Sequence, residues 1–222
     1  MEKISFLILI ILLSLSSVAQ AIVVKKNEDF LLSYDDGSLV IKKTSYNEEG
    51  TTSVPERNCK VTVKANDGKV YSPLYGRIDL LTGKFIFTIN GQDLICAVPV
   101  QQIVFDSCYT ALNSVVFKNG YPPIDKQNDK NFYQLLSEGK ATLLKHYELK
   151  WQDVIPYTST NTTRIYTQTV KYYLYSNNRM DKLGKNNRNL TRLLTITPGY
   201  LKKLDLKKED DMIKLLAYYN SL

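Results

Sequence analysis

The sequence predicts an α+β protein: a mainly antiparallel β meander of hairpins, followed by a short C-terminal helical segment. Apolar and polar residues alternate along most of the chain, most densely over residues 71–105, and such alternation is typical of half-buried strands. Asn-Gly and Asp-Gly pairs separate the alternating runs, as tight hairpin turns require. From Asn186 onward, apolar residues recur at helical spacing instead.

The chain begins with a predicted secretory signal peptide, residues 1–21. Two charged residues precede an unbroken run of apolar and small residues, residues 4–18, and a small-x-small cleavage pattern ends at Ala21. This run is shorter than the ~20 residues that span a membrane, and no stop-transfer pattern follows it. We therefore expect export, cleavage after Ala21 and no transmembrane span in the mature chain. The expected location is the periplasm, the cell surface or the medium.

Turn sequences divide residues 22–183 into hairpins, which we expect to form one antiparallel β-rich domain. Asn90-Gly91 is the clearest turn, because both residues tolerate the positive φ angles of a type I′ turn. Pro99 lacks an N–H group and is expected at a strand end, bulge or edge. Residues 46–56 are polar and predict a loop. The expected strands lie at residues 29–34, 38–42, 59–65 and 69–74, in three or four segments of 71–105, and at 113–118, 132–136, 140–149, 164–175 and 180–182.

Residues 184–222 predict three short helices packed on the β-rich domain. Thr197-Pro198 has the form of an N-cap followed by proline, and Asp205 is expected to open the last helix. The apolar residues of that helix follow i, i+3, i+4, i+7 spacing, so they share one face. This stripe either packs inside the molecule or docks on a partner protein. Its members are Met212, Leu215, Leu216 and Tyr219.

The net charge of +7 is concentrated near the C-terminus. From Arg179 onward, ten Lys or Arg residues stand against five Asp or Glu residues. An exported basic segment meets anionic envelope polymers or acidic glycans first, so we expect no nucleic-acid partner. A solvated helical face explains the same charges without any ligand.

The cysteines and the histidine give no sign of a metal or catalytic site. Cys59, Cys96 and Cys108 do not match metal-ligand spacing, and in an oxidising compartment they allow one disulfide and one thiol. Cys96 alternates with apolar residues and is interpreted as a small buried side chain. His146, the one histidine, is interpreted as a surface or structural residue. Because no phosphate-binding glycine loop is present either, we predict no cofactor and no metal.

No catalytic constellation is visible in the sequence. Carboxylate pairs occur at Asp35-Asp36 and at Asp210-Asp211, but turn chemistry and helix capping place acidic residues there without catalysis. A glycosidase would need two carboxylates facing each other across a cleft. We therefore predict a non-enzymatic protein and keep an envelope hydrolase with paired carboxylates as an alternative.

Tyrosine is unusually abundant, with sixteen tyrosines against one tryptophan. Along residues 164–175 the tyrosines fall on both faces of the predicted strand. One set can fill a core. The other set, Tyr173 and Tyr175, can form an exposed aromatic row that stacks sugars or docks a partner. Cross-strand pairing of these rings within the sheet is the alternative.

Three runs of sequence have a family likeness: DKNFYQLLSEGKATLLKHYEL, VKYYLYSNNRMDKL and KKEDDMIKLLAYYNSL. They resemble a group of uncharacterised small exported proteins of Bacteroidetes, and the resemblance covers residues 76–222. It implies a β-rich body, a KYYLY-like strand, a short helical C-terminus and an envelope or secreted location. It implies no activity and no ligand residues.

The leading hypothesis is therefore an exported, non-enzymatic cell-envelope or surface protein that binds a protein or a glycan. Besides the hydrolase, the other hypothesis is a small subunit of an envelope assembly that docks through the helical stripe.

Overall fold

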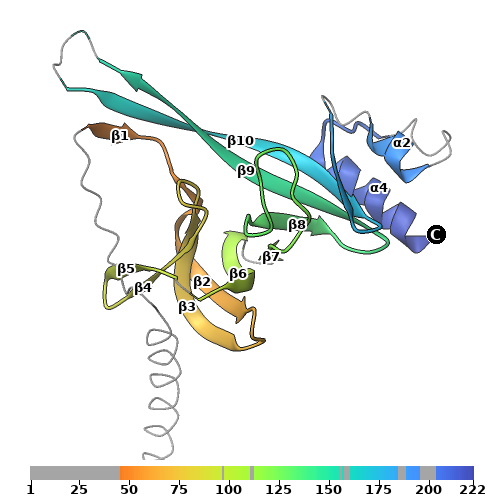
Figure 1. Cartoon of the computed structure of the whole chain (residues 1–222), viewed down its shortest axis with the longest axis horizontal. Helices are drawn as coiled ribbons and strands as arrows, with labels where there is room; N and C mark the ends of the chain where they lie inside the picture. The colour runs from red at the N-terminus through yellow and green to blue at the C-terminus, as the bar shows by residue number, and fades with distance from the viewer. Residues whose placement is uncertain are drawn as a thin grey trace, which may run out of the picture.

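The computed structural model describes residues 46–96, 98–110, 113–155, 157, 161–184, 189–195 and 204–222. Most of these residues lie in strands (Figure 1). The predicted signal peptide, the hairpin expected over residues 29–42 and the helix expected after Thr197 lie outside the described residues.

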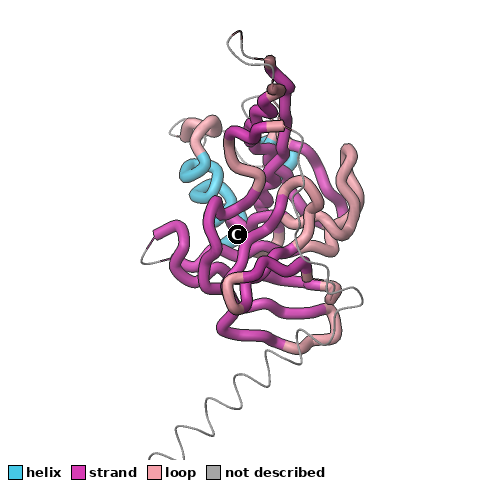
Figure 2. Tube along the Cα trace, turned by 90° about the vertical axis from the view of Figure 1, so that its left-hand side faces the viewer, coloured by secondary structure: helices cyan, strands magenta, loops and turns pink. Residues whose placement is uncertain are grey.

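The described strands form one sheet in the order β1-β10-β9-β8-β7-β6-β2-β3-β4-β5, with β11 paired to β10. All neighbouring pairs are antiparallel except β1 and β10, which are parallel, so the sheet is mixed rather than purely antiparallel. Figure 2, turned by 90°, shows that the strands coil strongly. The strands are β1 (Asn47–Glu49), β2 (Ser53–Ala65), β3 (Val70–Asp79), β4 (Phe85–Ile89), β5 (Gln92–Ile95), β6 (Val100–Thr110), β7 (Asn113–Lys118), β8 (Tyr133–Ser137), β9 (Ala141–Val154), β10 (Thr163–Ser176) and β11 (Arg179–Lys182).

Strand β1 corrects the prediction of a loop over residues 46–56. The backbone N–H of Asn47 donates a hydrogen bond to the Thr162 carbonyl at 2.9 Å, and the parallel register continues to Glu49 and Ile165. A polar sequence forms a strand here because the neighbouring backbone of β10 satisfies its hydrogen-bonding groups. Strand β2 also begins inside the predicted loop, at Ser53.

The hairpin turns follow local sequence as predicted. Asn90 and Gly91 have φ angles of 51° and 77° and connect β4 to β5. Asn177 and Asn178 have φ angles of 50° and 57° and connect β10 to β11. Both pairs therefore adopt the left-handed conformations of a type I′ turn. Pro99 lies immediately before β6, as its missing N–H group predicts.

Three clusters of buried side chains hold the sheet together. The first fills the coil of β2, β3, β4, β6 and β7, and the second lies between β9, β10 and the helices. The third lies on the opposite face of β9 and β10 and contains buried tyrosines. In β4 three consecutive residues are buried, so both faces of this strand contribute to packing rather than one: Phe85, Ile86 and Phe87.

The described helices are α2 (Leu190–Leu194) and α4 (Glu209–Ser221). They pack beside the start of β9 and the end of β10, which we call the inner ends of these strands (Figure 1). The Asn220 side chain closes this contact: its Oδ1 accepts from the Ala141 N–H at 2.9 Å, and its Nδ2 donates to the Ala141 carbonyl at 3.0 Å. Gly139 allows this approach, because a Cβ there would clash with the side chain of Asn220.

Helix α4 begins at Glu209, so the prediction that Asp205 opens it is wrong. The Asp205 carboxylate accepts from the Lys207 N–H at 3.2 Å, and the Asp205 carbonyl accepts from the Lys208 N–H at 2.9 Å. These bonds form a turn that precedes the helix.

Candidate ligand-binding surface

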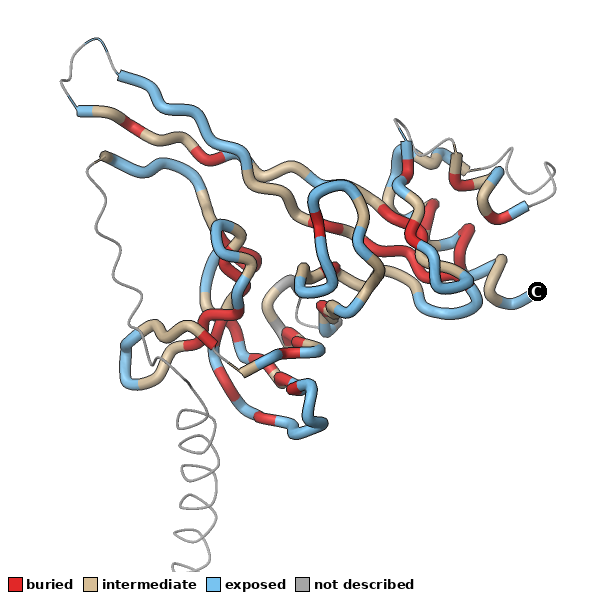
Figure 3. The backbone as a smooth tube through the Cα atoms, in the orientation of Figure 1, coloured by how far each residue is buried: buried red, intermediate tan, exposed pale blue. Residues whose placement is uncertain are grey.

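The outer ends of β9 and β10 project from the body as a hairpin, which we call the arm (residues 147–155 and 163–170). Helix α4 packs on the inner ends of the same strands and does not extend over the arm (Figures 1 and 3). From Lys150 to Ile155 every residue is exposed. The arm and its tip carry five of the large exposed apolar side chains: Trp151, Val154, Ile155, Tyr157 and Val170.

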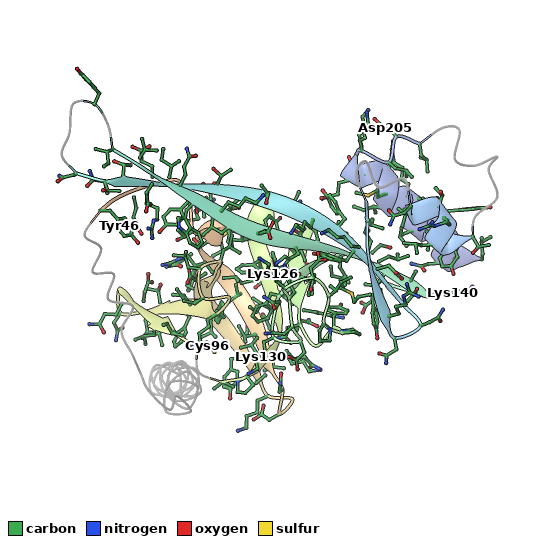
Figure 4. The ribbon with its side chains drawn as sticks, turned by 45° about the horizontal axis from the view of Figure 1, so that its top comes forward. Tyr46, Cys96, Lys126, Lys130, Lys140 and Asp205 are labelled. Carbon is green, nitrogen blue, oxygen red and sulfur yellow. A yellow bond between two sulfur atoms is a disulfide. The ribbon has the colours of Figure 1, made fainter. Side chains whose placement is uncertain are left out.

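A cluster around Arg164 orders one face of the arm. The Arg164 guanidinium donates two hydrogen bonds to the Asp153 carboxylate, at 2.6 and 2.7 Å, and one to the Tyr46 hydroxyl at 2.9 Å. Its Cζ lies 4.2 Å from the ring centre of Tyr46 and 5.7 Å from that of Trp151. Figure 4 labels Tyr46 near the outer end of the arm and Asp205 beside the helices.

Arg164 and Asp153 stabilise each other in their charged forms. The hydrogen bonds from Arg164 lower the pKa of the Asp153 carboxyl, and Asp153 in turn raises the pKa of the Arg164 guanidinium. A two-point Arg–carboxylate pair fixes the plane of the guanidinium. Trp151 is 57% exposed beside this fixed plane, so its indole is available for contact with a ligand.

Strand β1 and the start of β2 are tied to the same face. The Tyr166 hydroxyl donates to Glu48 Oε1 at 3.0 Å. The side-chain amide of Gln168 donates to the carbonyls of Thr51 and Ser53, at 3.3 and 3.1 Å. Between them, Gly50 has a φ of +88°, and a Cβ there would lie 2.5 Å from the Tyr166 carbonyl oxygen. Glycine is therefore required where β1 passes β10.

A groove of about 670 Å³ lies at the root of the arm. Its walls are the start of β2 on one side and Tyr147 and Gln168 on the other. Glu56 and Arg57 are exposed in this groove, and neither forms an ion pair with another described residue. The lining residues are Ser53, Val54, Pro55, Glu56, Arg57, Cys108, Tyr147 and Gln168.

A second cleft, of about 260 Å³, lies beside residues 146–149 of β9. The turn between β3 and β4 and Phe132 form its other walls. His146 lines it with a buried ring whose Nδ1 lies 3.2 Å from the Phe132 carbonyl, so the structural interpretation of His146 holds and the surface one does not. Burial lowers the pKa of His146, whereas the ion pair with Lys171 at 2.8 Å lowers the pKa of Glu148.

The predicted exposed row of Tyr173 and Tyr175 is not formed. Tyr173 is 0% exposed, and its hydroxyl donates to Asp125 at 3.1 Å. Tyr175 is half-buried, with its ring 5.2 Å from that of Tyr121. The connection after β7 folds over this face and supplies both partners, which periodicity within β10 could not reveal.

The predicted helical stripe faces the interior. Met212, Leu215 and Leu216 are fully buried in the cluster that contains Leu143 and Leu174. Tyr219 is partly buried at the edge of the same cluster. The stripe therefore packs inside the molecule. The hypothesis that these residues dock on a partner protein is wrong.

Cys59 and Cys108 form a disulfide with Cα atoms 5.6 Å apart, and Cys96 is buried with its thiol directed at the Val98 carbonyl at 3.5 Å. The disulfide joins β2 and β6 beyond the last residue pair of their ladder, Val61 and Phe105. Both outcomes match alternatives that the sequence left open. Within the described ranges, no cluster of three or more His, Cys, Asp or Glu residues could hold a metal ion.

Neither the groove nor the smaller cleft is lined by two carboxylates of described residues. Glu56 is the only carboxylate in the lining of the groove, and Glu148 is the only one lining the smaller cleft, among the residues that the structure describes. Asp210 and Asp211 lie in the first turn of α4, and Asp211 pairs with Lys214 at 3.1 Å. These positions do not place two carboxylates across a cleft.

Sequence reasoning gave no role to Trp151 or Arg164. The missing signal is the register of β9 against β10, which places Asp153 opposite Arg164 and Trp151 opposite Tyr166. In the described part of the chain, no helix has both the length and the apolar character needed to cross a membrane. No protein family, no curated protein and no solved structure matches this chain.

Proposed function

We propose that this protein is an exported, non-enzymatic cell-envelope or surface protein that binds another macromolecule through the arm. The observation that carries the proposal is the exposed indole of Trp151 on a face whose other side chains are held in place by Arg164 and Asp153. Large aromatic side chains beside arginine are the residues that most often dominate binding energy at interfaces. A pre-ordered face also loses little side-chain entropy when it binds.

Two further observations support the proposal. The predicted signal peptide, residues 1–21, would direct the chain to an oxidising compartment, and the Cys59–Cys108 disulfide is stable in such a compartment. Tyr147 and Gln168 line the groove at the root of the arm, and strand alternation places both on the same face of the hairpin as Trp151. A ligand of sufficient length could therefore contact both the groove and the indole. The partner is a protein or a glycan of the envelope.

A capture experiment tests this function. The mature chain from Ile22, tagged and immobilised, is incubated with the solubilised envelope fraction, and the bound proteins and glycans are quantified. We expect Trp151→Ala to reduce the captured partner at least tenfold, because the exposed indole is removed.

Tyr75 supplies the matched control. It is 56% exposed, close to the value for Trp151, but lies on β3, which is not part of the arm. Tyr75→Ala should capture as much partner as the unmodified protein. Equal capture by the two variants would refute binding through the arm. Because the chain has one tryptophan, a change in its fluorescence on addition of purified partner gives an independent readout.

A further inference from the structure

The outer edge of β9 has no neighbouring strand among the described residues from Tyr147 to Val154. Strand β9 is paired with β10 along its whole length, but with β8 only through residues 143–145. Proteins commonly shorten, charge or cover their sheet edges to prevent pairing with other chains. This edge carries charged side chains, but it is long and no described strand covers it.

The register shows which backbone groups of β9 point outward. The Tyr172 carbonyl accepts from Leu183 at 2.9 Å, so even-numbered residues of β10 direct their backbone groups away from β9. Odd-numbered residues of β10 therefore face β9, and they lie opposite even-numbered residues such as Leu144 and Lys150. In an antiparallel pair, two directly opposed residues direct their N–H and C=O groups either toward each other or both away from the partner strand. The odd-numbered residues of β9 therefore direct their backbone N–H and C=O groups away from β10, to the open edge. These are Tyr147, Leu149, Trp151 and Asp153.

The inner end of this edge leads into the smaller cleft. Tyr147, Glu148 and Leu149 line the cleft together with apolar residues from the body, among them Leu80 and Phe132. A strand laid along the edge would place one side chain over this opening. An edge supplies affinity through main-chain hydrogen bonds, and a neighbouring pocket supplies specificity for a side chain.

We infer that the outer edge of β9 receives an extended polypeptide segment of a partner protein as an additional strand, with one apolar side chain seated in the smaller cleft. This inference rests on the proposed function and names the partner as a protein. A polypeptide is favoured over a glycan because its backbone repeats N–H and C=O groups at the spacing of β9 itself. The edge also carries both charges, on Glu148 and Lys150, so it does not specifically attract a polyanion.

Amide hydrogen exchange, measured residue by residue by NMR, tests the inference directly. In the mature protein alone, the outward amides of Leu149 and Trp151 should exchange at least tenfold faster than those of Lys150 and Gln152, which bond to β10. The probe is a binder selected from a displayed library of random 12-residue peptides. Saturation with this peptide should slow exchange at Leu149 and Trp151 at least tenfold and leave Lys150 and Gln152 unchanged.

A proline substitution supplies a second test. Leu149→Pro removes one outward N–H group but no hydrogen bond to β10, and an edge strand tolerates proline at such a position. We expect it to weaken peptide binding at least tenfold, which corresponds to the loss of about one good hydrogen bond and its neighbours. Leu149→Ala removes the same side chain, and with it part of the cleft wall, but keeps the N–H group. Its binding should therefore fall less than that of Leu149→Pro, and the difference between the two variants measures the main-chain hydrogen bond. If Leu149→Pro does not fold, the exchange pattern decides alone.

Several results would overturn strand addition: no peptide selected above background, protection without the odd-even pattern, or equal binding by Leu149→Pro and Leu149→Ala. Recovery of a glycan alone from the envelope fraction would also overturn it, while the proposed function would stand. Conversely, loss of binding in Leu149→Pro but not in Trp151→Ala would support the edge and contradict the role of the exposed indole.

Discussion

The inner and outer halves of the β9–β10 hairpin share one continuous ladder but differ in what covers them. At the inner end, Leu143 lies opposite Leu174, and both are buried under α4. At the outer end, Asp153 lies opposite Arg164, and the neighbouring Trp151 is exposed. Backbone pairing is the same in both halves, so the difference shows that side-chain cover, rather than strand formation, separates the core from the candidate binding surface.

The largest expected effect lies at the inner end. Leu143→Ala should lower the free energy of unfolding by about 2–5 kcal/mol, because it opens a cavity in a fully buried cluster. Val170→Ala, in the exposed arm of the same hairpin, should change it by no more than about 0.5 kcal/mol. Urea unfolding followed by circular dichroism measures both. Similar losses in the two variants would mean that the arm is as firmly packed as the base.

The ion pair of Glu209 at the inner end of the hairpin should have the next largest effect on the free energy of unfolding. Glu209 Oε2 accepts from Lys145 Nζ and from the Tyr172 hydroxyl, both at 2.8 Å, and all three groups are at least partly buried. Glu209→Gln keeps the shape but removes the charge, and should cost about 1–2 kcal/mol. The same urea experiment measures it. The matched change in the exposed arm, Asp153→Asn, should shift the urea midpoint much less because water screens that pair.

His146 should make the inner half sensitive to acid. Burial holds its pKa below the ordinary value of 6.5, so the unfolded chain takes up a proton before the folded protein does. The free energy of unfolding should therefore have its full value above about pH 7.5 and decrease as the pH drops below about 6.5. The slope of this decrease should reach up to ~1.4 kcal/mol per pH unit.

His146→Gln is the control for this pH effect. It cannot be protonated in this range, so the part of the slope between about pH 6.5 and 5.5 that belongs to His146 should disappear. Thermal unfolding in a buffer series gives the comparison. An unchanged slope in the variant would assign the acid sensitivity to other groups.

The smallest effect is expected at the tip of the arm. Tyr157 is fully exposed, so Tyr157→Ser should change the free energy of unfolding by less than about 0.5 kcal/mol. A loss above about 1 kcal/mol in urea unfolding would show that the tip packs on something, and would move the boundary between the two halves outward.

Turns, which depend on local sequence, were predictable. Which strand faces are covered by distant segments of the chain was not. The turns at Asn90-Gly91 and Asn177-Asn178 depend on residues that tolerate positive φ, so sequence alone locates them. Tyr173 was misjudged because its cover comes from the connection after β7, which no periodicity in β10 encodes. Strand β1 was missed for a similar reason: its polar sequence pairs only because β10 is beside it.

The candidate surface was harder to predict than the fold. Trp151 and Arg164 are thirteen positions apart in sequence and meet through the register of a long hairpin. The predicted helical stripe had the correct periodicity, and Met212, Leu215 and Leu216 do share a face. Periodicity identifies an apolar face but not what packs on it, so the choice between core and partner had to come from the structure.

The parallel pairing of β1 with β10 bears on the order in which the sheet forms. Tyr166 bonds Glu48 across 118 residues of sequence. A contact this distant in sequence forms only after the long segment between its two strands has been brought back on itself, which costs chain entropy. The β9–β10 hairpin, in contrast, is local in sequence. We therefore expect the hairpin to form first and β1 to join it as a late step of folding.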